Sequence, residues 1–227
     1  IFYKVNEKFK KKLQILEIGI GIYADFRTDK FADLFKNLAK KKINVSFIGQ
    51  KNHINKLQSS LTSKYFFFYK FNYLISNNKD LSGNRLFLLI INYVIFLKNY
   101  LISILFIRKS NIKILIVSDD RSPDILLSLI KICKKKRIKI ILLPSGIFSS
   151  KKFVVQNRMT NLKNFMCQKK IINKNNLFTK IKGKYLSFYR KDILKLYNFF
   201  NILPKNPWIS GSNVDEIIFF SEASKNY

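Results

Sequence analysis

Short apolar runs alternate along this chain with longer segments in which apolar residues recur every three or four positions. The runs have the length of buried strands, and the periodic segments have the pattern of helices that bury one face. The pattern predicts strands at 13–22, 43–48, 65–71, 112–117, 138–143 and 216–220, and helices at 28–41, 53–61, 123–135 and 186–200. This alternation predicts an α/β, Rossmann-like domain with a parallel sheet and helices on both faces.

The longest apolar segment, residues 86–107, predicts a single long helix. Its length would suffice to cross a bilayer, but Lys98 interrupts it. Its polar residues Asn92, Asn99 and Ser103 fall on one narrow helical stripe. The pattern favours a mostly buried helix with a thin wet edge. A helix that docks on a bilayer and a true membrane span stay open as alternatives.

The charge balance adds a second signal. The chain carries 43 lysines and arginines against 13 acidic residues, a formal net charge of +30. Such a surface attracts polyanions, which include nucleic acid, anionic lipid headgroups and phosphorylated sugars or lipids. A hydrophobic fraction of 48% is ample for a buried core and excludes a disordered chain.

The two cysteines have no CxxC spacing, so the sequence predicts neither a zinc site nor a disulfide framework. They indicate a reducing, cytoplasmic compartment. We expect no metal and no cofactor.

The strand at 112–117 ends in the sequence Ser118-Asp119-Asp120-Arg121. In an open parallel sheet, ligands bind outside the carboxyl ends of the strands. An aspartate here can deprotonate a hydroxyl or hydrogen-bond a sugar, and Arg121 can orient the aspartate or hold a phosphate. In the alternative interpretation, one aspartate caps the helix that follows.

The first strand carries Gly19 and Gly21, which would allow the backbone to approach a ligand at the next helix N-terminus. The third glycine of a dinucleotide fingerprint is absent, and Ala24 stands there. Because a lone GxG is a weak signal, tight-turn geometry alone is the favoured explanation of the two glycines, with ligand contact as the alternative. The loop continues to Asp25 and Arg27, which we expect at the same edge of the sheet.

Other candidate groups have weaker support. His53 is the sole histidine, and its polar surroundings indicate a surface helix. Ser145 has no GxSxG elbow around it, which argues against a serine hydrolase. The later region mixes basic residues with aromatic ones, as nucleic-acid-binding surfaces do. The aromatic residues in question are Phe165, Tyr185, Phe188 and Tyr189.

The order of these pieces resembles the N-terminal half of a GT-B type glycosyltransferase, the class that builds bacterial surface polysaccharides and lipopolysaccharide. The resemblance depends on the glycine-bearing strand at 15–22, the long apolar helix, the 118–121 exit and the segment 140–146. It also depends on residues 213–224, which are similar to the alanine-aspartate, strand, Ser-Glu-Ala segment that closes the N-terminal domain in this class.

The resemblance implies two Rossmann-like domains that face each other across a cleft. Residues 1–227 would form the domain that binds the acceptor, and we expect the chain to be a fragment that lacks the C-terminal, donor-binding domain. An acceptor hydroxyl would attack the anomeric carbon of a nucleotide-sugar, and Asp119, Asp120 or Asp25 would deprotonate it if the enzyme inverts. The residues expected to bind substrate are Gly19, Gly21, Arg27, Arg121, Ser145, Gly146 and Glu222.

The partners implied are a nucleotide-sugar, bound through the missing domain, and a glycan or lipid-linked acceptor. Acceptors in this class are often lipid-linked, so the basic surface predicts a protein peripheral to the inner face of the cytoplasmic membrane. Two alternatives stay open: a sugar-nucleotide epimerase or capsule biosynthesis enzyme of related fold, and a basic nucleic-acid-binding module.

Overall fold

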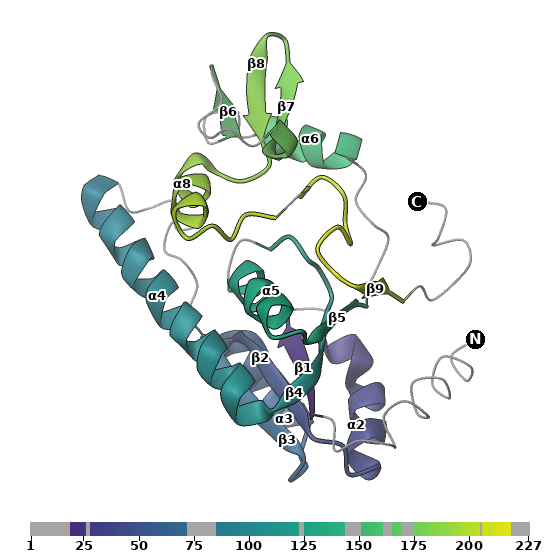
Figure 1. Ribbon diagram of the computed structural model, residues 1–227. Coiled ribbons are helices and arrows are strands. Elements are labelled where there is room, and N and C mark those ends of the chain that lie inside the picture. The colour runs from purple at the N-terminus through teal and green to yellow at the C-terminus, as the bar shows by residue number, and fades with distance from the viewer. Residues whose placement is uncertain are drawn as a thin grey trace.

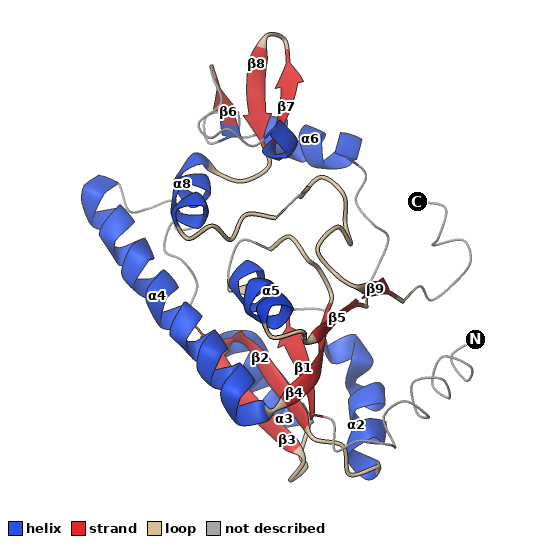
Figure 2. Ribbon diagram, in the orientation of Figure 1, coloured by secondary structure: helices blue, strands red, loops and turns tan. Residues whose placement is uncertain are grey.

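The computed structural model describes residues 19–25, 28–71, 85–122, 125–143, 151–160, 165–168, 175–204 and 206–218. A six-stranded parallel sheet forms the larger part of the molecule, and helices pack against both of its faces (Figures 1 and 2). This confirms the α/β, Rossmann-like fold that the sequence predicts.

The elements lie close to the predicted ranges. The strands are β1 (Gly19–Ala24), β2 (Val45–Gln50), β3 (Phe66–Phe71), β4 (Ile112–Val117), β5 (Lys139–Leu142), β6 (Met166–Cys167), β7 (Phe178–Ile181), β8 (Lys184–Ser187) and β9 (Glu216–Ile217). The helices are α2 (Ala32–Lys40), α3 (Lys51–Ser60), α4 (Arg85–Ser110), α5 (Leu126–Lys135), α6 (Lys151–Met159) and α8 (Lys191–Phe199), with 3-10 turns η1 (Thr28–Phe31) and η3 (Asn175–Leu177).

The strand order of the large sheet is β3-β2-β1-β4-β5-β9. The chain builds outward from β1 to β3, and α4 then carries it back to β4 on the other side of β1. This is the doubly wound order, and it reverses direction between β1 and β4. Loops leave the carboxyl ends of these two strands in opposite directions, which opens the place where ligands of such sheets bind.

Alternate residues of each central strand face opposite layers, as the two-residue period of a strand requires. Ile20 and Ile22 of β1 belong to a core that α2 and α3 cover. Tyr23 belongs to a second core, which α4 and α5 cover. Strands that are buried on both faces read as continuous apolar runs, and this explains why the sequence pattern located them.

A second, three-stranded antiparallel sheet, β6-β8-β7, was not predicted. It lies with α6 and α8 beyond the carboxyl ends of the large sheet (Figure 2). The predicted helix at 186–200 is wrong in its first part, because β8 occupies 184–187 and α8 begins only at Lys191. Lys182 and Gly183 both have positive φ, 47° and 76°, as a two-residue hairpin loop requires.

The long helix α4 is not the mostly buried helix with a water-exposed polar edge that the sequence predicts. Its polar stripe faces inward: Asn92, Asn99 and Ser103 are 6%, 4% and 0% exposed. Its outer face is apolar, and the large hydrophobic side chains exposed along it are Phe87, Ile90, Tyr93, Val94, Leu97, Leu101 and Leu105. Within the described residues, α4 is the one helix long and apolar enough to cross a membrane. It lies along one flank of the molecule (Figure 1).

Candidate functional site

Asp25 and Ser118 meet at the point where the strand order reverses. Asp25 follows β1 and Ser118 follows β4, and the Ser118 hydroxyl donates to Asp25 Oδ2 at 2.5 Å. The Thr28 hydroxyl donates to Asp25 Oδ1 at 3.3 Å, and the Asp25 N–H donates to Thr28 Oγ1 at 2.8 Å. The Asp25 carboxylate is therefore held at the ligand-binding edge by hydroxyl groups from two loops.

The neighbouring strand adds two polar groups at this edge. Ala24 pairs with Gly49 in the sheet, so the next residue, Gln50, lies level with Asp25. Gln50 Oε1 and His53 Nδ1 are both buried and have no hydrogen-bond partner among the described residues. Buried polar atoms are rarely left unpaired, so these two are candidates for contact with a ligand.

Asp120 has a different position from its neighbours. Its side chain is 0% exposed, and its two carboxylate oxygens accept the N–H groups of Gly211 and Asn213, each at 3.0 Å. Burial raises the pKa of this carboxyl, while the two N–H groups act in the opposite direction. This position favours a structural role: Asp120 ties the loop after β4 to the turn before β9.

Asp119, unlike Asp120, is among the residues that line a cavity of about 280 Å³. The Nε–H of Arg121 donates to Asp119 Oδ1 at 3.1 Å, and the Arg121 and Asp119 side chains are 13% and 24% exposed. Arg121 Nη1 is buried and has no partner among the described residues. The loop after β4 thus presents one carboxylate and one incompletely paired guanidinium to the cavity.

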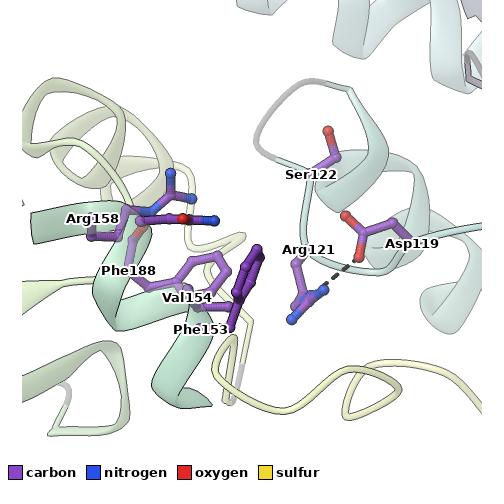
Figure 3. Close-up of a pocket in the computed structure, with 8 residues that line it drawn as sticks. Asp119, Arg121, Ser122, Phe153, Val154, Arg158 and Phe188 are labelled. Carbon is purple, nitrogen blue, oxygen red and sulfur yellow. Dashed lines mark hydrogen bonds and ion pairs between the residues drawn. The ribbon is translucent and has the colours of Figure 1, made fainter. Parts of the chain in front are cut away.

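The opposite wall of the cavity comes from the region of the small sheet. Figure 3 shows Phe153, Val154, Arg158 and Phe188 across the cavity from Asp119, Arg121 and Ser122. Arg158 lies over the Phe165 ring at 4.7 Å and the Phe188 ring at 5.5 Å, and its Nε–H donates to the Phe188 carbonyl at 3.1 Å. Burial lowers the pKa of this guanidinium, and the nearby charge of Arg121 acts in the same direction.

Gly19 and Gly21 both belong to β1, and Gly19 is its first residue. A Cβ on Gly19 would stand 2.7 Å from the Ser110 carbonyl oxygen, and one on Gly21 would stand 2.6 Å from Ile112 Cδ1. Close packing of β1 against its neighbours therefore accounts for both glycines, and their positions give no support to ligand contact. The other residues expected to bind substrate, Arg27, Ser145, Gly146 and Glu222, lie outside the described residues.

Three of the four aromatic residues singled out in the later region are buried, and Tyr185 is partly exposed. Phe165, Phe188 and Tyr189 are buried in a core that also contains residues of α4 and α5. The Tyr189 hydroxyl donates to the Arg121 carbonyl at 2.9 Å, so this core is tied to the loop after β4. Among the described residues, no group of three or more histidine, cysteine or acidic side chains is placed to hold a metal.

Sequence reasoning missed part of the site. Arg158 could be identified only as one of many basic residues, because no local pattern relates it to Arg121. Gln50 ends an apolar strand and gave no signal beyond that position. Only the tertiary fold brings these residues to the edge that Asp25 and Asp119 mark.

No protein-family model matches this sequence, and the search of the curated proteins found no match. MurG of Acinetobacter baumannii is among the solved structures with a similar arrangement: the TM-score is 0.39 and the identity 9%, over 58% of this chain and 36% of that one. For the glycotransferase of kitacinnamycin the TM-score is 0.37 and the identity 10%, over 63% and 34%. The matched part thus spans about a third of each of these structures. Likenesses at this level establish no shared function.

We predict that Asp120→Ala lowers the free energy of unfolding by roughly 2 to 4 kcal/mol, because it leaves the buried N–H of Asn213 and the partly buried N–H of Gly211 without an acceptor. Urea denaturation followed by circular dichroism measures this loss. Asp33→Ala is the matched control, because the Asp33 side chain is 96% exposed. An unfolding midpoint that moves equally in both variants would contradict the structural role of Asp120.

The same carboxyl gives the stability a pH dependence. Its pKa is raised in the folded protein, so on raising the pH from about 3.8 the unfolded chain loses this proton first. The contribution of Asp120 to the free energy of unfolding is therefore largest at low pH and declines until the folded carboxyl ionises. The free energy of unfolding of Asp120→Asn should lack this decline. If the wild type instead became more stable relative to Asp120→Asn as the pH rises, the pKa of Asp120 would be lowered in the folded protein.

Proposed function

We propose that this chain is the acceptor-binding half of a GT-B type glycosyltransferase. The observation that carries the proposal is the convergence of Asp25 and the loop 118–121 at the carboxyl ends of β1 and β4, beside a cavity. An acceptor hydroxyl needs a carboxylate within hydrogen-bond reach and further polar groups to orient its sugar. This edge supplies both, in the doubly wound strand order whose crevice binds ligands.

In the proposed reaction, Asp25 accepts the proton of the acceptor hydroxyl. The hydroxyl oxygen forms a bond to the anomeric carbon of the donor sugar, and the bond from that carbon to the nucleotide diphosphate breaks. Asp119 hydrogen-bonds the acceptor from the adjacent position, with its orientation fixed by Arg121. A second domain would hold the nucleotide-sugar, since the described residues contain one Rossmann-like sheet.

We predict that Asp25→Asn lowers transfer by a factor of about 100 or more, because the amide cannot accept the proton. The experiment uses the complete gene product that carries this chain, with radiolabelled UDP-, GDP- and dTDP-activated sugars and a lipid extract of bacterial membranes. Transfer is measured as label that becomes lipid-soluble or polymeric.

Asp33→Asn serves as the matched control, because this aspartate is exposed on α2 and lies outside the site. Circular dichroism confirms that both variants fold. Full activity in Asp25→Asn would remove Asp25 from the mechanism. A wild-type product that transfers none of these sugars would overturn the proposed function.

We further propose that the protein acts at an anionic membrane surface, where α4 docks. The apolar side chains exposed on this helix recur every three or four residues from Phe87 to Leu105, so they form a continuous stripe. At 1.5 Å per residue the stripe is about 27 Å long. A stripe of this size on the outside of a soluble protein marks a surface that is covered in use.

The positive charge near this apolar stripe favours an anionic bilayer as the surface that contacts it. Lys98, Arg108 and Lys109 are exposed on the same helix, and basic residues beside an apolar face are typical of helices that lie on anionic membranes. Docking fits the structure better than a membrane span, because Asn92 and Asn99 face inward and Phe96 packs on α8. A span would leave these packed groups without their partners.

We predict that Leu101→Asp weakens binding to vesicles of phosphatidylglycerol and phosphatidylcholine about tenfold, because it removes apolar contact and adds a repelled charge. Co-sedimentation measures the bound fraction. Ile209→Asp is the matched control, since Ile209 is 59% exposed and Leu101 58%, and Ile209 does not lie on α4.

Binding of wild type and Ile209→Asp with equal affinity supports α4 as the docking surface. Equal weakening of both variants would show that only the general positive charge attracts the vesicles. Binding that is indifferent to Leu101 would show that α4 stays away from the lipid.

A further inference from the structure

The cavity beside Asp119 has walls of two different kinds. Arg121 and Arg158 supply guanidinium groups from opposite sides, as Figure 3 shows. Phe153, Val154 and Phe188 supply apolar surface, and Phe153 is 53% exposed. A ligand that fits these walls has an anionic end and an apolar or neutral remainder.

The charges inside the cavity do not balance. Asp119 is the one carboxylate among the described lining residues, and it is paired with Arg121 Nε. Arg121 Nη1 is buried without a described partner, and the one hydrogen bond recorded for the Arg158 guanidinium uses Nε. Within the described part of the lining, two cations thus face the cavity against one anion. Partly buried cations are normally paired, so this described lining suits an anionic ligand.

We propose that this cavity binds the phosphoryl group of an organic phosphate, between the guanidinium groups of Arg121 and Arg158, with the organic part against Phe153 and Val154. Planar guanidinium groups with several N–H donors match the oxygens of phosphate. The identity of the ligand rests on the proposed function: there it is the phosphate of a lipid-linked acceptor. The leaving nucleotide carries the same chemistry, so the test includes both sources.

The fluorescence of Trp208 can report whether a ligand occupies the cavity. Trp208 is the only tryptophan, it is 5% exposed, and its ring lies 5.2 Å from that of Phe188 in the cavity wall. Titration with geranyl diphosphate, UDP or inorganic pyrophosphate is followed by Trp208 emission and by calorimetry. We expect geranyl diphosphate to bind most tightly, because it alone adds an apolar chain to the phosphoryl groups.

We expect the arginine variants and Asp119→Asn to change the dissociation constant in opposite directions. Arg121→Ala raises the dissociation constant about tenfold or more, because it removes the guanidinium with the open donor. Arg158→Lys also weakens binding, because the charge stays but the planar fork is lost. Asp119→Asn lowers the dissociation constant about threefold, since the amide still accepts from Arg121 Nε but no longer repels the anion. Damage to the fold would not tighten binding, so this variant keeps the test decisive if Arg121→Ala does not fold.

Arg108→Ala is the control for net charge, because Arg108 is exposed at the end of α4. Equal weakening in Arg108→Ala and Arg121→Ala would reduce the effect to general attraction and overturn the proposal. So would weaker binding in Asp119→Asn, or no heat and no emission change with any of the three ligands. Tighter binding of UDP than of geranyl diphosphate would assign the cavity to the nucleotide and overturn the acceptor assignment.

Asp25→Asn separates this proposal from the proposed function. It should bind geranyl diphosphate as the wild type does, because Asp25 is not among the residues that line the cavity. If the wild-type gene product binds these phosphates but transfers no sugar, the cavity assignment is supported and the proposed glycosyltransferase function is overturned.

Discussion

The geometry of the site depends on the hydrogen bonds that the buried carboxylate of Asp120 accepts from Gly211 and Asn213. This carboxylate holds two N–H groups of the turn before β9, and Gly211 provides the first of them from a φ of 85° that a glycine adopts freely. Asp119 and Arg121, the residues on either side of Asp120, line the cavity. The bonds to Asp120 therefore anchor the loop from which both side chains reach the cavity.

The small antiparallel sheet completes the site instead of standing apart from it. Its core includes Phe96 of α4 and Leu127 of α5, so it packs directly on the larger domain. The Tyr189 hydroxyl donates to the Arg121 carbonyl, and burial raises the pKa of Tyr189 well above its ordinary value, so it stays a donor. This hydrogen bond and the aromatic packing set the distance between the loop after β4 and Arg158.

Sequence alone predicted the large sheet because its strands are buried on both faces, and the two-residue and 3.6-residue periods survive without tertiary information. It also located Asp25 and Asp119, because the ends of apolar strands mark the ligand edge. It could not predict that Arg158 faces Arg121, since their approach depends on how the small sheet packs. The β7–β8 hairpin was missed because its strands have four residues each. Helical periodicity found the polar stripe of α4 but placed it outward, because a period gives the faces of a helix and not their surroundings.

The direction of α4 links the apolar stripe to the site. The helix ends at Ser110, immediately before β4 begins, so it runs antiparallel to the strands and its first turns lie at their carboxyl ends. Tyr93 of this half contacts Phe199 and Phe200 at the end of α8, next to the small sheet. A bilayer that covered the stripe would therefore meet the protein at the same end as Asp25 and the two arginines. The phosphate of an acceptor anchored in that bilayer would then lie close to the cavity. This gives one physical reason why α4 has its apolar face outward beside a cationic pocket.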